Sequence, residues 1–344
     1  MKRTAIIQVA GTLLAGILYL PPALAEDAVL NLYTARHYQT DEALYTNFTK
    51  ATGIRINRID GKEDELLQRI RREAGASPAD VFITVDAANL QAADDADLFV
   101  PVRSKTLDAR IPSQFRGEDN HWFGFSYRAR VIAYNRDKVK PEEAQRYLDL
   151  AHPRFKGRLC VRSGGHVYNR TLMASIIYNL GEDRAFDWAR GIVANLARPP
   201  KGGDTDQIRA VAAGECDVAI SNHYYYARLM ASDKAADQEV VKKVGIIFPD
   251  QKGKGTHVNI SGGGMLRYAP NKAAAVKFLE YLASDEAQAY FANGNNEWPV
   301  VASAKTDNKQ LDALGKFKVD QLSAGILAQY TPKAQRFIDR AGWK

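Results

Sequence analysis

The segment from residue 28 to residue 84 alternates between strand-like and helix-like stretches, and this alternation restricts the fold more than any other feature. Apolar, β-branched runs typical of strands flank two stretches whose apolar side chains have helical spacing. The expected strands are 28–33, 54–59 and 79–84. The first expected helix begins after Thr40, its N-cap, and stops at Gly53, and the second begins at Glu63 and stops at Gly75. A β-α-β-α-β order predicts a parallel sheet with right-handed crossovers.

A second α/β unit is expected further along the chain. Its strand-like stretches are 159–162, 216–220 and 243–248, with helix-like stretches between them. The β-rich segment 123–134 is too long for a simple edge strand, so we expect it to cross between the units, with 258–265 as the return crossing. The glycines at 262–264 would allow a hinge or a close backbone approach. Helices at 272–282 and 285–291 and a tail should finish the chain.

The first 25 residues have the pattern of a cleavable secretory signal peptide. Lys2 and Arg3 precede an apolar run, and Ala23-Leu24-Ala25 matches the small-x-small cleavage site. Export to the periplasm is therefore expected. Removing the two cations lowers the formal net charge from +7 to +5, and the remaining charges of both signs are spread along the chain, so we expect no nucleic-acid partner.

Cys160 and Cys216 are the two cysteines of the chain. An even pair in an exported protein suggests a disulfide, although spacing alone does not show whether the two Cα atoms are close enough. The absence of a CxxC spacing argues against a zinc site or a thioredoxin-type redox motif.

Tyrosines mark the ends of three expected strands. His37 and Tyr38 follow the first strand, Tyr168 follows a glycine-rich loop, and Tyr224 and Tyr225 follow 216–220. Ligands bind at this edge of an open α/β sheet. A phenol gives up its proton near neutral pH only to a strong local positive charge, so converging phenolates favour a trivalent ion such as Fe³⁺. The alternative is a half-buried aromatic patch or an interface, and Tyr226 should point away if the strand alternates its faces.

Four stretches together resemble the periplasmic ferric-ion-binding proteins of ABC iron importers, in particular a tyrosine-rich branch, found in cyanobacteria and other bacteria, that needs no synergistic anion. The stretches are 33–44, 162–169, 222–228 and 258–264. The resemblance covers the mature chain. It implies an α/β, two-lobed type II solute-binding fold, in which each lobe is a mixed sheet flanked by helices and hinge strands cross between the lobes. The first lobe would be 26–126 with 255–300, and the second 127–254 with 301–344.

The resemblance also implies a site and a role. Tyr38, Tyr168, Tyr224 and Tyr225 would bind the metal, His37 would be a fifth ligand, and Arg128 and Arg228 would lie near the metal. The ligand would be Fe³⁺, held by a monomeric, non-catalytic carrier and delivered to an ABC permease in the inner membrane. The sequence departs from one common pattern by placing His223 before the tyrosine pair and Tyr226 after it.

Two other classes of protein fit parts of the sequence. A binding protein for an oxyanion such as phosphate or sulfate would use helix N-termini, serines and arginines. A periplasmic metalloenzyme or redox protein would use His37 and the tyrosines around an open coordination position. The sequence shows no arrangement of nucleophile, base and orienting group, which ranks the enzyme below the carrier.

Overall fold

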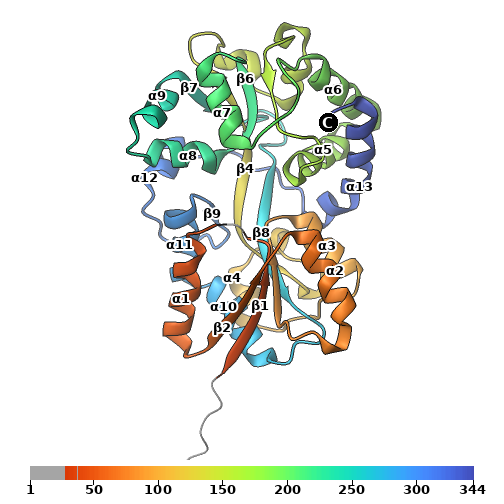
Figure 1. Cartoon of the computed structure of the whole chain (residues 1–344), viewed down its shortest axis with the longest axis vertical. Coiled ribbons are helices and arrows are strands. Elements are labelled where there is room, and N and C mark those ends of the chain that lie inside the picture. Colours follow the sequence, from red (N-terminus) through yellow and green to blue (C-terminus); the bar gives the residue numbers. More distant parts are fainter. Residues whose placement is uncertain (1–27, 37) are drawn as a thin grey trace, which may run out of the picture.

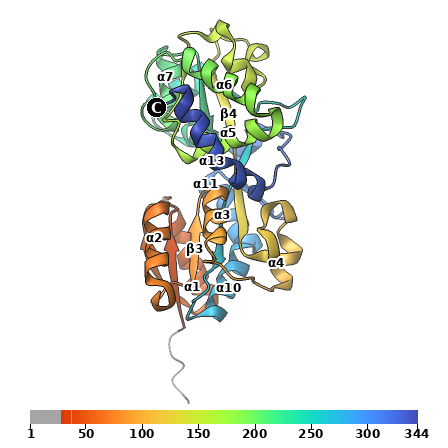
Figure 2. The same cartoon turned by 90° about the vertical axis from the view of Figure 1, so that its right-hand side faces the viewer.

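The computed structural model of the chain describes residues 28–36 and 38–344. The predicted signal peptide and His37 lie outside these described residues. The molecule has two lobes with a narrow connection between them, which is seen from two directions in Figure 1 and Figure 2. The two-lobed α/β prediction is confirmed.

The sheet of the first lobe begins with the three strands that the alternating pattern predicted. Strand β1 (Val29–Thr34) lies between β2 (Arg55–Asp60) and β3 (Val81–Thr84), and pairs with both in parallel. Strand β8 (Val258–Met265) adds to β3 in the antiparallel direction, which makes the sheet mixed. Around the sheet lie α1 (Asp41–Thr52), α2 (Glu63–Glu73), α3 (Ala87–Asp95), α4 (Lys105–Arg110), α10 (Lys272–Leu282) and α11 (Asp285–Asn295).

Strand β4 (Phe123–Asn135) connects the two lobes, as its length predicted. Its first half pairs with β8 and with β9 (Trp298–Pro299), and its second half pairs with β6 (Val218–Asn222) and β7 (Val244–Ile247). The described strands therefore form one sheet in the order β2-β1-β3-β8-β4-β6-β5, with β7 and β9 also on β4. Figure 1 shows β4 and β8 running together from one lobe into the other.

The second lobe is built on β5 (Leu159–Cys160), β6 and β7. Its helices are α5 (Val167–Leu180), α6 (Glu182–Ala194), α7 (Asp204–Ala213), α8 (His223–Ala231), α9 (Ala235–Lys243), α12 (Lys309–Leu314) and α13 (Ala324–Ala341). Short 3-10 turns occupy Ala74–Ala76, Ser113–Phe115, Glu118–Asn120, Pro141–Ala144, Tyr147–Ala151 and Pro153–Phe155.

Each lobe has its own hydrophobic core. The first core includes Phe48, Phe82 and Phe278, and the second includes Leu172, Trp188 and Ile338. A smaller cluster behind β6 contains Cys160 and Cys216. Burial of large apolar side chains in separate clusters stabilises each lobe as a unit, because each lobe removes its own apolar surface from water.

Helix α13 corrects the prediction of a tail after α11. Leu327, Phe337 and Ile338 on one face of α13 join the second core. Pro332 lies inside this helix, although an internal proline usually argues against one. In Figure 2, α13 runs from the second lobe towards α3 of the first.

One predicted N-cap makes no capping hydrogen bond, and one predicted helix end differs slightly. Helix α1 begins after Thr40 as predicted, but the Thr40 side chain makes no capping hydrogen bond and contacts the Asn295 side chain instead. Helix α2 ends at Glu73, and Ala74, rather than Gly75, takes the positive φ of 45°. At Thr40 a tertiary contact decides a position for which local propensity gives only a weak preference.

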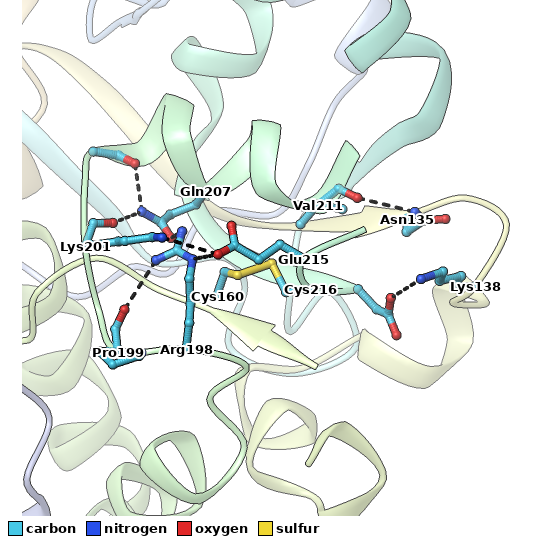
Figure 3. Close-up of a disulfide and its surroundings, with 12 residues drawn as sticks. Asn135, Lys138, Cys160, Arg198, Pro199, Lys201, Gln207, Val211, Glu215 and Cys216 are labelled. Atoms are coloured by element: carbon cyan, nitrogen blue, oxygen red, sulfur yellow. Dashed lines mark hydrogen bonds and ion pairs between the residues drawn. A yellow bond between two sulfur atoms is a disulfide. The ribbon is translucent and has the colours of Figure 1, made fainter. Parts of the chain in front are cut away.

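A disulfide joins Cys160 and Cys216, whose Cα atoms are 5.8 Å apart. Cys160 ends β5 and Cys216 lies just before β6, and these two strands pair in parallel. Figure 3 shows the bond in the interior, with Glu215 held nearby by Arg198 and Lys201. The cross-link therefore fastens the two neighbouring strands that lead to Tyr168 and to Tyr224.

The glycines of β8 serve close approach of the backbone. None of Gly262, Gly263 and Gly264 has a positive φ. A Cβ on Gly263 would lie 2.7 Å from the Phe82 carbonyl oxygen, and a Cβ on Gly262 would collide with the Phe123 carbonyl oxygen. Of the two expected uses of this triplet, the structure shows the close approach.

Candidate functional site

Tyr168 and Tyr224 meet at the edge of the second lobe. Each is the second residue of a helix, α5 or α8, that follows a strand of the sheet. Their hydroxyl oxygens are 3.1 Å apart, and both side chains are buried. The first turn of a helix carries a partial positive charge, so this position favours side chains that become negative.

Tyr225 lies beside this pair and Tyr226 does not. The rings of Tyr224 and Tyr225 have centroids 4.2 Å apart. Tyr226 is buried among the residues behind β6, and its hydroxyl donates to the Val244 carbonyl at 2.8 Å. The prediction that Tyr226 points elsewhere is confirmed, but its reason was wrong, because the tyrosines occupy the first turn of α8 and not the end of a strand.

Tyr38 reaches the same cluster from the first lobe. It lies in the loop between β1 and α1, and its ring packs at right angles against Tyr224, with centroids 5.9 Å apart. Val85 completes this small buried cluster. The structure thus brings together the four predicted tyrosines from three strand-to-helix connections in two lobes.

Arg128 lies beneath the tyrosines on the crossing strand β4. Its guanidinium carbon is 5.5 Å from the centre of the Tyr168 ring, and Nη1 donates to Ser261 Oγ at 3.1 Å. The side chain is buried, and its Nε and Nη2 have no hydrogen-bond partner among the described residues. Buried N–H donors without partners are costly, which suggests that they serve an acceptor that comes with a ligand.

Arg228 covers the cluster from the solvent side. Its guanidinium carbon lies 5.3 Å from the ring centre of Tyr38, 5.0 Å from that of Tyr224 and 5.8 Å from that of Tyr225. One exposed cation therefore contacts three of the four aromatic faces, and it can stabilise negative charge that develops on their oxygens.

Glu297 is a site residue that the sequence reading missed. It follows α11, is fully buried, and its Oε1 accepts a hydrogen bond from the Tyr38 hydroxyl at 3.0 Å. Its Oε2 accepts from Ser126 Oγ at 2.7 Å and pairs with Arg36 at 3.4 Å. No local motif marks it, because its partner Tyr38 lies 259 residues away in the sequence.

His223 is also more than a neighbour of the tyrosine pair. Its Nδ1 accepts from the Ala129 backbone N–H at 3.2 Å, and its Nε2 is 2.7 Å from the Asn296 carbonyl oxygen. Burial lowers the pKa of His223 to about 3 and outweighs the hydrogen bonds that favour the charged form. The ring is therefore neutral, with its proton on Nε2, which donates to Asn296.

The buried phenols resist ionisation when no cation is present. Burial raises the pKa of Tyr38, Tyr168 and Tyr224 above the ordinary value, and their mutual repulsion adds to the effect, while Arg128 opposes it. For the Glu297 carboxyl, burial also works against the charge, but Arg36 and Arg128 outweigh it and hold the pKa below its usual value. The phenols can thus lose their protons only to a ligand of high positive charge.

Other kinds of metal site are not seen in the described part of the chain. Over residues 28–36 and 38–344, no three or more His, Cys, Asp or Glu side chains gather as a set of metal ligands. Within the same residues, every helix is too short or too polar to cross a bilayer.

Two α/β lobes joined by crossing strands, with converging side chains from both lobes, define a two-lobed solute-binding protein. The model of the bacterial extracellular solute-binding proteins matches residues 43–318. The chain belongs to this family.

Relatives within the family are similar over nearly the whole chain. The iron uptake protein A1 of Synechocystis sp. is 47% identical over 319 residues, which cover 93% of this chain and 88% of that protein. A Trichodesmium protein, IdiA or FutA, solved with iron and citrate, is 50% identical with a TM-score of 0.87, covering 92% of this chain and 100% of that one. A ferric binding protein from Campylobacter jejuni is 41% identical, also with a TM-score of 0.87, over 92% and 100%.

Proposed function

We propose that this protein binds ferric ion between its two lobes and delivers it to an ABC permease in the inner membrane. The observation that carries the proposal is the convergence of Tyr38, Tyr168, Tyr224 and Tyr225, with the hydroxyls of Tyr168 and Tyr224 3.1 Å apart. A hard trivalent cation is the ligand that best offsets the cost of ionising buried phenols. Similar proteins that are named for iron uptake and for ferric binding support the same ligand.

The four phenol oxygens are the proposed ligands, with His37, outside the described residues, as a fifth. Four phenolates and Fe³⁺ carry a net charge of minus one. Arg128 and Arg228 supply positive charge on opposite sides of the cluster, and the free N–H groups of Arg128 would donate to phenolate oxygens in charge-assisted hydrogen bonds.

Tyr168, Tyr224 and Tyr225 come from the second lobe, and Tyr38 comes from the first. The ion would bind the larger set first and then draw in Tyr38 as the lobes close. Closure is favourable because it adds one more ligand, whose negative charge the cation attracts. The proposed lobe boundaries, 26–126 with 255–300 and 127–254 with 301–344, are supported by the separate hydrophobic cores.

The protein would act as a monomeric carrier in the periplasm and not as an enzyme. The relatives are solute-binding and uptake proteins by name, which supports a carrier. A periplasmic location agrees with the signal-peptide pattern of the first 25 residues and with the extracellular family.

An oxyanion carrier is the alternative that the arginines could suggest. An oxyanion site is expected to use helix N-termini, serines and arginines. Here Arg128 and Arg228 lie against aromatic rings, and the side chains that converge are tyrosines. The structure therefore favours a cation over phosphate or sulfate.

The decisive experiment is titration of the metal-free mature protein with ferric citrate, followed by visible absorption and calorimetry, with inorganic phosphate as the parallel ligand. Phenolate-to-iron charge transfer should give a coloured complex with iron, and phosphate alone should produce no binding heat. A colourless ferric complex would exclude the phenolate site, and tight binding of phosphate without iron would favour the oxyanion carrier.

A further inference from the structure

The residues Asn296, Glu297 and Trp298 form a bridge, here called the 296–298 bridge, between the two halves of the candidate site. Glu297 holds the Tyr38 hydroxyl of the first lobe at 3.0 Å. The residues on either side of Glu297 both contact His223, the residue immediately before Tyr224. Three consecutive residues therefore contact both sets of proposed ligands.

His223 is held by the 296–298 bridge on two sides. Its Nε2 donates to the Asn296 carbonyl oxygen at 2.7 Å, and its ring stacks on the Trp298 indole with centroids 3.8 Å apart and an angle of 25°. The side chain is fully buried, so no water competes for these contacts. Stacking and a buried hydrogen bond together fix both the position and the rotation of the ring.

The third contact of His223 lies where β4 changes partners. Ala129 is the last residue of β4 in register with β8, and Arg130 is the first in register with β6. At this point the Ala129 N–H donates to His223 Nδ1 at 3.2 Å. His223 thus ties the start of α8 to the place where the strand passes from one lobe to the other.

The 296–298 bridge is itself held firmly. Asn296 has a left-handed φ of 58° and ends α11, and its side-chain oxygen accepts from Asn308 Nδ2 at 2.8 Å. Trp298 pairs with Tyr127 of β4. Residues 296 and 298 are at most about 7 Å apart along the chain, so Tyr38 and Tyr224 are positioned from one short, rigid segment.

We propose that His223 is a positioning residue which, through the 296–298 bridge, couples the tyrosine pair of α8 to Tyr38, so that the two half-sites bind iron as one unit. This inference rests on the proposed ferric site. His223 does not bind the ion itself, because both of its ring nitrogens already have protein partners. The proposal concerns coupling between ligands that come from different lobes.

A double-mutant cycle tests the coupling. The variants are Tyr38→Phe, His223→Phe and both together, and the measurement is Fe³⁺ affinity against a citrate competitor. Phe keeps a ring against Trp298 but loses both hydrogen bonds. His223→Phe should weaken binding about 10- to 100-fold, as for other residues that orient metal ligands. The loss of Fe³⁺ affinity in the double variant should be at least about threefold smaller than the product of the two single losses, because the effects of interacting residues on the binding free energy do not add.

The matched control replaces His223→Phe by Tyr226→Phe, a change in the same helix on the side away from the cluster. Its effect should simply multiply with that of Tyr38→Phe. At saturating iron, His223→Phe should keep the charge-transfer band of the wild type, because every proposed ligand remains. Loss of the band would show that His223 is a ligand and would overturn the positioning role.

If His223→Phe does not fold, as judged by circular dichroism, Trp298→Leu serves in the same cycle because it removes the stacking partner. Multiplicative losses in the cycle, with a wild type that binds iron, would overturn the coupling and leave the ferric site intact. A wild type that forms no coloured complex would instead overturn the proposed function.

Discussion

At the residue scale, neighbouring side chains of one type have separate roles. Tyr224, Tyr225 and Tyr226 are consecutive, yet the first two face the cluster and the third donates to Val244 on the far side of α8. The difference follows from helical geometry, because successive residues are rotated by about 100°. Neighbouring positions with the same residue type can therefore have different roles.

Tyr225→Phe should weaken iron binding at least about 100-fold, because it removes a direct ligand and not merely a residue that orients one. Tyr226→Phe should change the affinity less than about threefold and should lower stability by about 1 kcal/mol through its lost hydrogen bond. Competition titration and thermal unfolding measure the two effects. Equal losses of affinity in both variants would show that the orientation of α8 is wrong.

Iron affinity should fall steeply as the pH is lowered. The raised pKa values of Tyr38, Tyr168 and Tyr224 mean that these phenols are protonated before iron binds and must release their protons to it. Each released proton makes the apparent affinity about tenfold weaker per pH unit. Titrations between pH 8 and pH 6, corrected for protonation of citrate, should show a loss larger than tenfold per unit, and a pH-independent affinity would contradict phenolate binding.

The sequence located the tyrosines but not the residues that support them. Tyr38, Tyr168 and Tyr224 lie in the connections that follow strands, and the order of elements already predicts that these connections share one edge of the sheet. Glu297 and Trp298 contact the site from a turn after α11, and such long-range contacts leave no periodic signal in the sequence. Arg128 could be placed on a crossing strand, but its unpartnered N–H groups appear only once the packing is known.

At the scale of elements, the disulfide is placed where it can hold two ligand-bearing connections together. Tyr168 and Tyr224 each lie eight residues after one of the bonded cysteines. Because β5 and β6 are parallel, both connections leave the sheet at the same edge. The backbone pairing between β5 and β6 is only two residues long. The cross-link therefore helps to hold the two strands, and with them Tyr168 and Tyr224, in position.

Replacement of both Cys160 and Cys216 by Ala should lower the free energy of unfolding by about 2–4 kcal/mol, because the bond closes a long loop, with the cysteines 56 positions apart. Calorimetry with and without a phosphine reductant measures the effect. The reductant should lower the melting temperature of the wild type and leave that of the double variant unchanged. A wild type that is insensitive to full reduction would show that the backbone contacts suffice.

At the scale of the whole molecule, two neutral histidines are buried near the connection between the lobes. Burial lowers the pKa of both His223 and His257 to about 3. In the unfolded chain a histidine has a pKa of about 6.5. Between these values the unfolded state binds more protons, so stability is lost as the pH falls from about 6.5 towards 3, and neither histidine contributes above that window.

The metal-free protein should therefore be less stable at pH 5 than at pH 7, by roughly 2 kcal/mol for each of the two histidines. His257→Gln removes one of these groups and lies outside the tyrosine cluster. Urea unfolding at both pH values should show a drop that is about 2 kcal/mol smaller in the variant than in the wild type. An equal drop in both proteins would exclude His257 as a source of the acid sensitivity.

Strand β4 has a consequence for how the chain unfolds. Its first half is an internal strand of one lobe and its second half an internal strand of the other, so neither lobe can lose β4 without opening the sheet of its neighbour. Domains joined by a simple linker often melt one after the other, whereas here the loss of either core exposes backbone donors in both. The two lobes should therefore unfold in a single cooperative transition, and partly unfolded molecules with one intact lobe should be scarce.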